Sequence, residues 1–254
     1  MFPILQIGPL AIQTPGLFLL ISIWIGLSLA GKRAHLHNLQ PELLDNLVFA
    51  ALAGFIVGGR FFYVAENLST FLASPFDIFS LNYSLFDPAG GLAAGLLTGL
   101  IFGQRKGLTL RPTLDALTPF FATLAVGIGA SHLASGEAFG KETSLSWGIV
   151  LHGATRHPSQ AYEIAAGLFI LNLVGLRPPF AIHGKQFLVF AAFTAGAALF
   201  LEAFRGDSVV IAGGLRLGQI IAWVVMAAAL LGLDRLNTND STPKVEGQRS
   251  QTDG

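Results

Sequence analysis

The sequence predicts an all-α, polytopic membrane protein with seven transmembrane helices, its N-terminus outside and its C-terminus in the cytoplasm. Of its 254 residues, 52% are hydrophobic and only 12% are charged, which is about half the charged fraction of an ordinary soluble domain. Seven apolar segments can be counted, each close to the roughly 20 residues that one crossing needs. The basic residues between these segments fall mainly on one side, which sets the orientation.

The first apolar segment, residues 15–31, is followed at once by Lys32 and Arg33. A secretory signal peptide carries its positive charge before the apolar core and not after it. We therefore expect this helix to remain in the membrane as an anchor whose N-terminus lies outside.

Six further apolar segments follow along the chain. The second, residues 43–66, contains Arg60. The third, residues 85–103, is dense in glycine and alanine and includes Gly95-x-x-x-Gly99, a composition that lets membrane helices approach closely. A mixed polar stretch precedes the fifth segment. The last four segments are expected at about residues 113–129, 160–176, 186–204 and 215–233.

We expect one seven-helix domain over residues 1–233 and a disordered cytoplasmic tail over residues 234–254. The tail is rich in polar residues and has too few apolar side chains to form a core. Ten of the fifteen basic residues lie on the side of the tail, which the positive-inside rule makes cytoplasmic. The five that are left outside or in the outer part of a helix are Arg60, Lys141, Arg156, Arg205 and Arg216.

Composition also excludes several classes of function. A net charge of zero provides no global field for nucleic acid, so we expect no nucleic-acid partner. Because the chain has no cysteine, it has no disulfide, thiolate metal ligand or cysteine nucleophile, and any reacting thiol must come from a substrate. No metal-site spacing, nucleotide loop or serine triad is found, and we expect no cofactor and no metal.

Polar residues gather instead near the outer helix ends. Several arginines with few neighbouring carboxylates suit a phosphate group, because a guanidinium binds its oxygens bidentately and keeps its charge when desolvated. Arg60 is notable because a cation inside a span costs roughly 2.5–3.5 kcal/mol and needs a partner or a watery cavity. The expected ligand is an anionic phospholipid headgroup; a structural ion pair remains the alternative for Arg60.

A set of short motifs carries a family resemblance. In order, they are Gly59-Arg60-Phe61-Phe62-Tyr63-Val64, Gly90-Gly91-Leu92, Gly136-Glu137-Ala138-Phe139-Gly140, Trp147-Gly148, Arg156-His157-Pro158-Ser159-Gln160, Tyr162-Glu163, Glu202, Phe204-Arg205, Asp207 and Gly218-Gln219. With this order and spacing the chain resembles the phosphatidylglycerol–prolipoprotein diacylglyceryl transferase family of bacteria.

The resemblance implies transfer of a diacylglyceryl group from phosphatidylglycerol to the thiol of a lipoprotein signal-peptide cysteine, the first step of lipoprotein maturation. It places the protein in the bacterial cytoplasmic (inner) membrane, with phosphatidylglycerol, a lipoprotein precursor and the bilayer as partners. The residues it marks as catalytic are Arg205, His157 and Glu163. Those it marks as substrate-binding are Glu137, Arg60, Arg156, Gln160, Tyr162, Glu202 and Gln219.

Three departures from the family pattern keep a second interpretation open. Ala89 stands where the family has a histidine, and Gly206 stands where it has a proline. The signature arginine and asparagine that precede Gly136 are absent, with His132 near the asparagine position. The candidate bases are therefore His157, His132 and Glu163, and the alternative is a catalytically silent relative that binds phospholipid or lipoprotein precursor. A transporter is a third possibility, without the internal repeats that such folds show.

Overall fold

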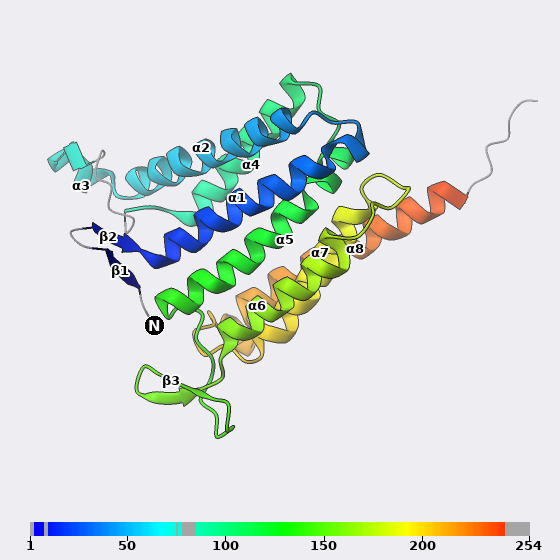
Figure 1. Cartoon of the computed structure of the whole chain (residues 1–254). Helices are drawn as coiled ribbons and strands as arrows, with labels where there is room; N and C mark the ends of the chain where they lie inside the picture. The colour runs from blue at the N-terminus through cyan, green and yellow to red at the C-terminus, as the bar shows by residue number, and fades with distance from the viewer. Residues whose placement is uncertain (1–2, 8–9, 75, 78–84, 242–254) are drawn as a thin grey trace, which may run out of the picture.

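The computed structural model describes residues 3–7, 10–74, 76–77 and 85–241, and within these ranges the chain is a bundle of long helices (Figure 1). The main helices are α1 (Thr14–Ala34), α2 (Pro41–Glu66), α4 (Pro88–Arg105), α5 (Leu110–Ser135), α6 (Ser159–Ile170), α7 (Lys185–Glu202) and α8 (Leu217–Ser241). The short helical elements are η1 (His35–His37), α3 (Leu68–Ala73), η3 (Leu171–Gly175) and η4 (Ala212–Gly214).

Two small antiparallel hairpins accompany the helices, an addition to the all-α prediction. The first pairs β1 (Ile4–Ile7) with β2 (Leu10–Gln13), and the second pairs β3 (Ile149–Leu151) with β4 (Ala154–Arg156). Their strands have only three or four residues, so neither forms a layer of the fold.

Helix α5 lies at the centre of the bundle and joins its two halves. It packs against α1 on one side and against α6, η3 and α7 on the other, while α2 packs on α4 and α1, and α8 packs on α7. Half of the apolar window of α5 is buried, compared with 11% for α8. The buried helix therefore holds the fold together, and the peripheral helices leave their apolar faces on the outside.

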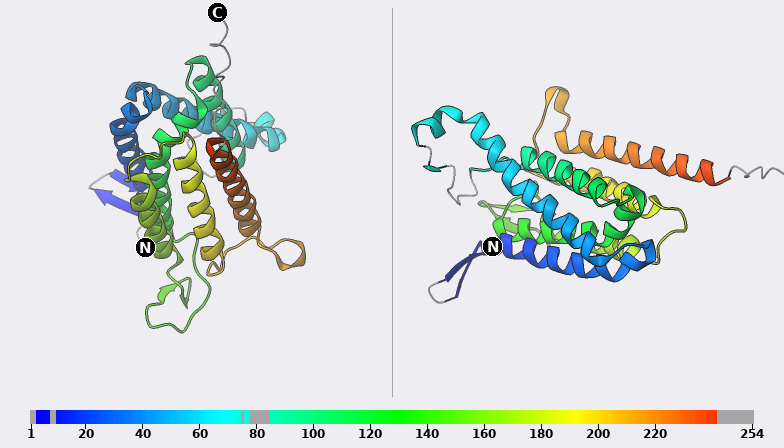
Figure 2. Two further views of the ribbon diagram at one scale, coloured as in Figure 1. Left: turned by 90° about the vertical axis from the view of Figure 1, so that its right-hand side faces the viewer. Right: turned by 90° about the horizontal axis from the view of Figure 1, so that it is seen from above.

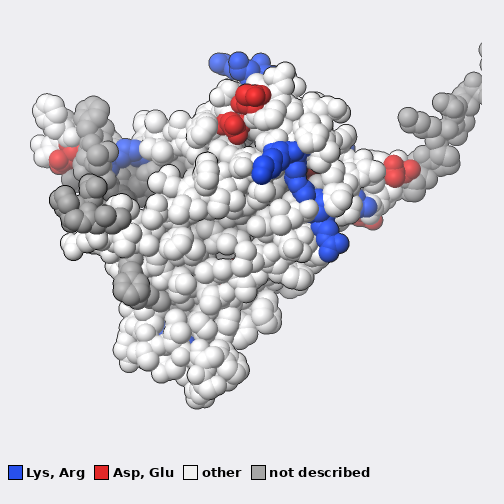
Figure 3. Space-filling model, in the orientation of Figure 1, with Lys and Arg blue, Asp and Glu red and all other residues white. Residues whose placement is uncertain are grey.

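Five helical segments of the described chain are long and apolar enough to cross a membrane: Thr14–His37, Pro41–Glu66, Leu110–Ser135, Lys185–Glu202 and Leu217–Asp240. Glycine-rich α4 and the short α6 are not among them. Large apolar side chains such as Trp24, Phe61 and Trp223 point outward, with 60% or more of their surface exposed. Figure 3 shows a broad face nearly free of charge, with charged residues gathered towards its ends. These features establish a helical membrane protein.

The predicted close packing of the third apolar segment is confirmed. A Cβ atom added to Gly58 of α2 would lie 2.1 Å from the Cβ of Ala94 in α4, and one added to Gly95 would lie 2.9 Å from the carbonyl oxygen of Ala51. Only glycine lets the two backbones come this close, which is the expected role of small residues between membrane helices.

The bundle has two distinct ends, which are visible in two orientations (Figures 1 and 2). We call the end that carries both hairpins, α3 and the α7–α8 connection the hairpin end. The opposite end carries η1, the α4–α5 and η3–α7 connections and the end of α8. Helix α8 continues to Ser241, past residue 234 where we expected the tail to begin, because extending a formed helix is far easier than nucleating one. Residues 242–254 of the expected tail lie outside the described residues.

Candidate functional site

A group of charged side chains at the hairpin end surrounds Arg205, just after α7. Its Nε and Nη2 atoms donate to the two carboxylate oxygens of Asp207 at 3.0 and 3.1 Å. Its Nη1 lies 3.5 Å from Oε1 of Glu163, and its Nε lies 3.8 Å from Oε2 of Glu202. Three carboxylates from α6, the end of α7 and the following turn therefore converge on one guanidinium. The expectation of arginines with few neighbouring carboxylates is thus wrong for Arg205, because the fold brings together carboxylates that lie far apart in the sequence.

Glu163 connects this arginine to a histidine. Its second carboxylate oxygen, Oε2, lies 2.7 Å from Nδ1 of His132, near the end of α5. Both side chains are mostly buried, with 18% of the Glu163 side chain and 26% of the His132 side chain exposed. We call His132, Glu163, Glu202, Arg205 and Asp207 the Arg205 cluster.

Arg205 is a permanent cation, and its surroundings favour the charged form further. Burial alone would lower its pKa, but the hydrogen bonds to Asp207 and the charges of Asp207, Glu163 and Glu202 outweigh burial and raise the pKa above its ordinary value. The cluster therefore contains a permanent cation whose orientation is set by a bidentate partner.

Backbone contacts fix the turn that bears Arg205. The amide of Lys141 donates to the carbonyl of Phe204 at 2.7 Å, and the amide of Gly206 donates to the carbonyl of Phe139 at 2.8 Å. A proline at residue 206 could not make the second bond, because it has no N–H group. A Cβ atom added to Gly206 would also lie 2.8 Å from the carbonyl oxygen of Gly140, so the turn suits glycine rather than the proline that the resemblance led us to expect.

Arg216 anchors the same turn from the α8 side. Its Nη1 donates to the carbonyl oxygens of Glu202 and Arg205 and to Oγ of Ser208, the last two at 3.2 and 3.1 Å. These contacts are with the turn itself, and they give Arg216 a structural role.

Arg156, at the end of β4, also contacts mainly backbone carbonyls. It donates to Leu151 at 3.1 Å and to Gly140 at 3.3 Å, and its guanidinium lies 5.0 Å from the ring centre of Phe139. Its carboxylate neighbour Glu142, at 3.4 Å, is 71% exposed. These contacts support a structural role for Arg156, which the resemblance marked as substrate-binding, and they join the β3–β4 hairpin to the segment that supports Arg205.

Ser159 and Gln160 begin α6 and are fully buried. The Ser159 hydroxyl donates to the carbonyl of Ala138 at 2.5 Å, and Nε2 of Gln160 donates to the carbonyl of Glu137 at 2.9 Å. They join the start of α6 to the turn after α5, whereas the Glu137 side chain is exposed. Glu163 and His132, one on each of these helices, are thereby held at a fixed separation.

His157 and Tyr162 belong to an aromatic group beside the cluster. The ring centre of His157 lies 5.2 Å from that of Phe204 and 6.3 Å from that of Tyr162. Nδ1 of His157 is buried without a hydrogen-bond partner among the described residues. The Tyr162 hydroxyl accepts a hydrogen bond from Nε1 of Trp147 at 3.0 Å.

Two predicted residues relate to the start of α8. Gln219 lies in its first turn and is half-buried. Glu202 lies so close to this turn that a Cβ on Gly218 would be 2.9 Å from its carboxyl carbon. A carboxylate at a helix N-terminus is stabilised by the helix dipole, so Glu202 serves both α8 and Arg205.

Arg60 lies outside the Arg205 cluster. It projects from α2, which packs against α1, α3 and α4, and it donates to the carbonyl oxygens of Leu85 and Asp77. Its guanidinium also lies 5.7 Å from the ring centre of Phe71. These contacts join α2 to α3 and to the chain leading into α4, which supports a structural role.

Sequence reasoning named most members of the cluster but not the way they connect. His132 was weighed only as one of three possible bases, and its contact with Glu163 joins residues 31 positions apart. The available signal was that both lie near helix ends flanking one polar stretch. From that pattern one can predict that the two helix ends lie near each other, but not which of their side chains are in contact.

Comparison with known proteins gives a consistent family. The sequence model of the family described as prolipoprotein diacylglyceryl transferase matches residues 3–233. Proteins named phosphatidylglycerol–prolipoprotein diacylglyceryl transferase are similar over most of their length. One from Pseudoalteromonas atlantica is 31% identical, covering 80% of this chain and 74% of its own. One from Oleidesulfovibrio alaskensis is 29% identical, covering 94% of this chain and 95% of its own.

Proposed function

The chain belongs to the prolipoprotein diacylglyceryl transferase family, and we propose that the Arg205 cluster is where it performs the family reaction. That reaction moves the diacylglyceryl group of phosphatidylglycerol to the cysteine thiol of a lipoprotein signal peptide. A new sulfur–carbon bond forms at the glyceryl carbon that carried the phosphate. The carbon–oxygen bond at this carbon breaks, and glycerol phosphate leaves.

The observation that carries this proposal is the chain of contacts from His132 through Glu163 to Arg205, at 2.7 and 3.5 Å. The contact at Nδ1 leaves Nε2 of His132 to accept the thiol proton. The Glu163 carboxylate orients the ring and stabilises the imidazolium that forms, the usual arrangement for a positioned base. The thiolate then attacks, because the deprotonated sulfur is the nucleophile.

Arg205 is placed to stabilise the departing phosphate. Asp207 holds two of its donor atoms at 3.0 and 3.1 Å, while its contacts with Glu163 and Glu202, at 3.5 and 3.8 Å, are longer than an ordinary hydrogen bond. Nη1 can therefore donate to a phosphate oxygen placed beside it while Nε and Nη2 of the planar guanidinium stay bound to Asp207. A fixed cation aimed at developing charge is usually the largest electrostatic contribution to such a step.

The other predicted residues receive supporting roles in this proposal. Glu202 and Asp207 orient Arg205; Tyr162, Gln160 and Arg156 hold the turns around it. His157, predicted as a base, packs its ring on Phe204, which suits a positioning role better than proton transfer. Glu137 and Gln219, at the edges of the cluster, remain our candidates for contacts with the lipid headgroup.

We propose that all seven main helices cross the bilayer, with the N-terminus outside. α4 packs along α2, and α6 with its continuation η3 packs along α5, although neither is counted among the five apolar spans. Ten of the fifteen basic residues then face the cytoplasm. This orientation places the Arg205 cluster at the outer surface of the bacterial inner membrane, in reach of phosphatidylglycerol and an exported signal peptide.

A mass-shift assay tests the proposal. The purified protein, in phosphatidylglycerol liposomes, is given a synthetic signal peptide with one cysteine, and the diacylglyceryl adduct is measured by mass spectrometry. His132→Gln should lower kcat by about 10²–10⁴-fold, with little change in the KM for lipid. The matched variant His157→Gln, which alters a neighbouring imidazole, should have a much smaller effect.

Two results would contradict this assignment. A loss of kcat in His157→Gln that equals or exceeds that of His132→Gln would move the base to His157. Absence of product from the parent protein, despite phosphatidylglycerol binding, would favour the silent relative. Ala89 motivates that alternative, because this position in the first turn of α4 carries no titratable side chain.

A further inference from the structure

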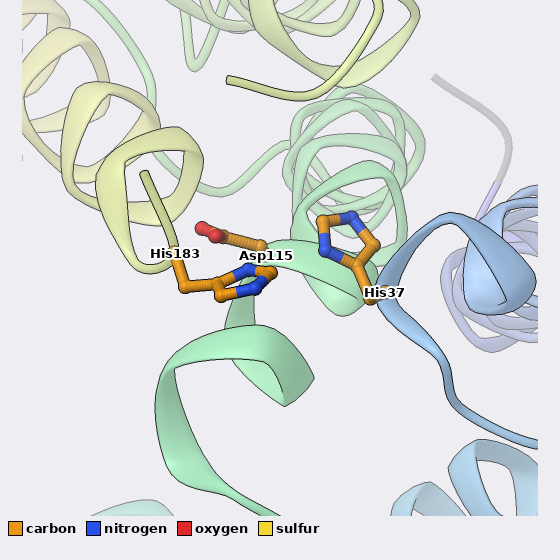
Figure 4. Close-up of side chains that lie close together, drawn as sticks. All are labelled: His37, Asp115 and His183. Atoms are coloured by element: carbon orange, nitrogen blue, oxygen red, sulfur yellow. The ribbon is translucent and has the colours of Figure 1, made fainter. Parts of the chain in front are cut away.

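Three polar side chains meet at the end of the bundle opposite the Arg205 cluster. They are His37 of η1, Asp115 of α5 and His183 in the turn before α7, each offering one ligand atom within 4.8 Å of the others. Figure 4 shows the side chains converging from three separate elements. We propose that they bind a divalent metal ion of the zinc class.

The chemistry of the three donors suits such an ion. Zinc takes imidazole nitrogen and carboxylate oxygen at about 2.0–2.2 Å, usually with four ligands in a tetrahedron. Ligand atoms of a tetrahedron of that size lie roughly 3.3 Å apart. The three ligand atoms lie within 4.8 Å of one another, so any pair near that limit must come closer when the ion binds. The exposed His183, in a turn, is the one that can move, and its side leaves room for water as a fourth ligand.

Asp115 is held in place with coordination capacity to spare. Its Oδ2 accepts from the amide of Gly184 at 2.5 Å, and its Oδ1 accepts from the amide of Phe187 at 2.9 Å. A carboxylate has about four lone-pair positions, so two remain for a metal. The backbone bonds also preorganise the carboxylate, as ligating carboxylates are in metal sites.

An independent observation points to a ligand here. His37 is buried, with only 6% of its surface exposed, and its Nδ1 has no hydrogen-bond partner among the described residues. Buried polar atoms are nearly always paired. The ring of His37 faces His183 and Asp115 (Figure 4), which places this otherwise unexplained histidine at the proposed site.

Neighbouring cations oppose metal binding and must be counted. Arg33 acts electrostatically on His37 and donates to the carbonyl of Arg177 at 2.6 Å, and the side chain of Arg111 passes close to Gly184. Only Asp115 supplies negative charge among the three donors. Binding should therefore be moderate in affinity, and the ion would serve to fasten the η3–α7 turn to η1 and α5.

Metal titration of the full chain tests the site. The protein is purified without a polyhistidine tag, stripped with a chelator in detergent and titrated with Co²⁺ and then Zn²⁺. We expect one ion per chain, visible Co²⁺ absorption typical of tetrahedral nitrogen and oxygen ligation, and a rise in Tm with Zn²⁺. His183→Ala should weaken binding by at least about tenfold, since even outer partners of metal ligands contribute 10–100-fold.

His35→Ala is the matched control, because His35 is an exposed histidine in the same η1 turn. It should bind Co²⁺ and Zn²⁺ as the parent does. The proposal is overturned if the parent binds neither ion, or if His35→Ala loses binding as much as His183→Ala. These readouts do not depend on transferase activity, so their failure would leave the assignment of the Arg205 cluster unaffected.

Discussion

The two ends of α5 use carboxylates in opposite ways. At the hairpin end, Glu163 contacts other side chains, His132 and Arg205, and remains partly exposed. At the opposite end, Asp115 is 2% exposed, and each of its oxygens accepts a backbone amide hydrogen at the start of α7. The first arrangement keeps charged groups available to a substrate, whereas the second uses a charge to stabilise the fold.

The separation between the ends makes this contrast testable. Asp115 and His132 lie 17 residues apart on one helix, since 132 − 115 = 17, which is about 25 Å at 1.5 Å per residue. Sites this far apart without shared partners usually behave independently. Substitutions at the hairpin end should therefore reduce activity with little effect on stability, and those around Asp115 should do the reverse.

Of the three substitutions that test this contrast, Arg205→Ala should have the largest effect. Removing the cation that faces the leaving phosphate should lower kcat by about 10²–10³-fold, as for other preorganised electrostatic groups. Because Arg205 lies in a partly exposed turn, Tm in detergent should change little. The mass-shift assay and thermal unfolding are run together, with Arg205→Lys as the companion that keeps the charge but loses the bidentate geometry. A large fall in Tm that accounts for the lost activity would remove the contrast between the two ends.

Asp115→Ala should have the next largest effect, on stability. Two backbone amides at the start of α7 lose a charged acceptor, and each buried unsatisfied group costs about 1–3 kcal/mol. Unfolding is followed in the presence of a chelator, so that any bound metal does not contribute. Asp115→Asn, which keeps one acceptor oxygen, should lie between the parent and the alanine variant. The contrast would be contradicted if Asp115→Ala left the free energy of unfolding unchanged. It would also be contradicted if Asp115→Ala lowered kcat per folded molecule as much as Arg205→Ala does.

The smallest effect is expected for Glu142→Ala, which tests whether every ion pair at the hairpin end matters. The Glu142 side chain is 71% exposed and lies 3.4 Å from Arg156, and exposed pairs contribute about 0–1 kcal/mol. Arg156 keeps its two carbonyl contacts. Both Tm and kcat should stay close to those of the parent. A clear fall in kcat would extend the functional region from the Arg205 cluster into the β3–β4 hairpin.

Much of the fold could be predicted because the bilayer constrains it strongly. A chain in hydrocarbon must satisfy its backbone polar groups internally, so apolar segments of sufficient length become helices. Each predicted segment overlaps a main helix, from residues 15–31 within α1 to residues 215–233 overlapping α8, and residues 160–176 continue from α6 through η3. The two hairpins and α3 were not predicted, because such short elements carry little periodic signal.

The candidate site was predicted as a list of residues and not as a network. Arg60, Arg156 and Arg205 are alike in sequence, each an arginine near a helix end or in an outer turn. The first two donate to backbone carbonyls, whereas Arg205 faces three carboxylates. A guanidinium bonds with whatever acceptors the fold supplies, so its type alone does not distinguish a structural role from a chemical one.

Composition and apolar length by themselves determined the helical membrane class, and the order of motifs determined the family. Apolar length and motif order are each summed over many residues, so a substitution at one position changes neither of them much. Only the tertiary structure decided that His132 meets Glu163 and Arg205, and that His37, Asp115 and His183 meet at the opposite end. These contacts depend on how α5 packs against segments that are distant in sequence. A contact between two side chains produces no periodic pattern in the sequence, so it could not be predicted from the sequence alone.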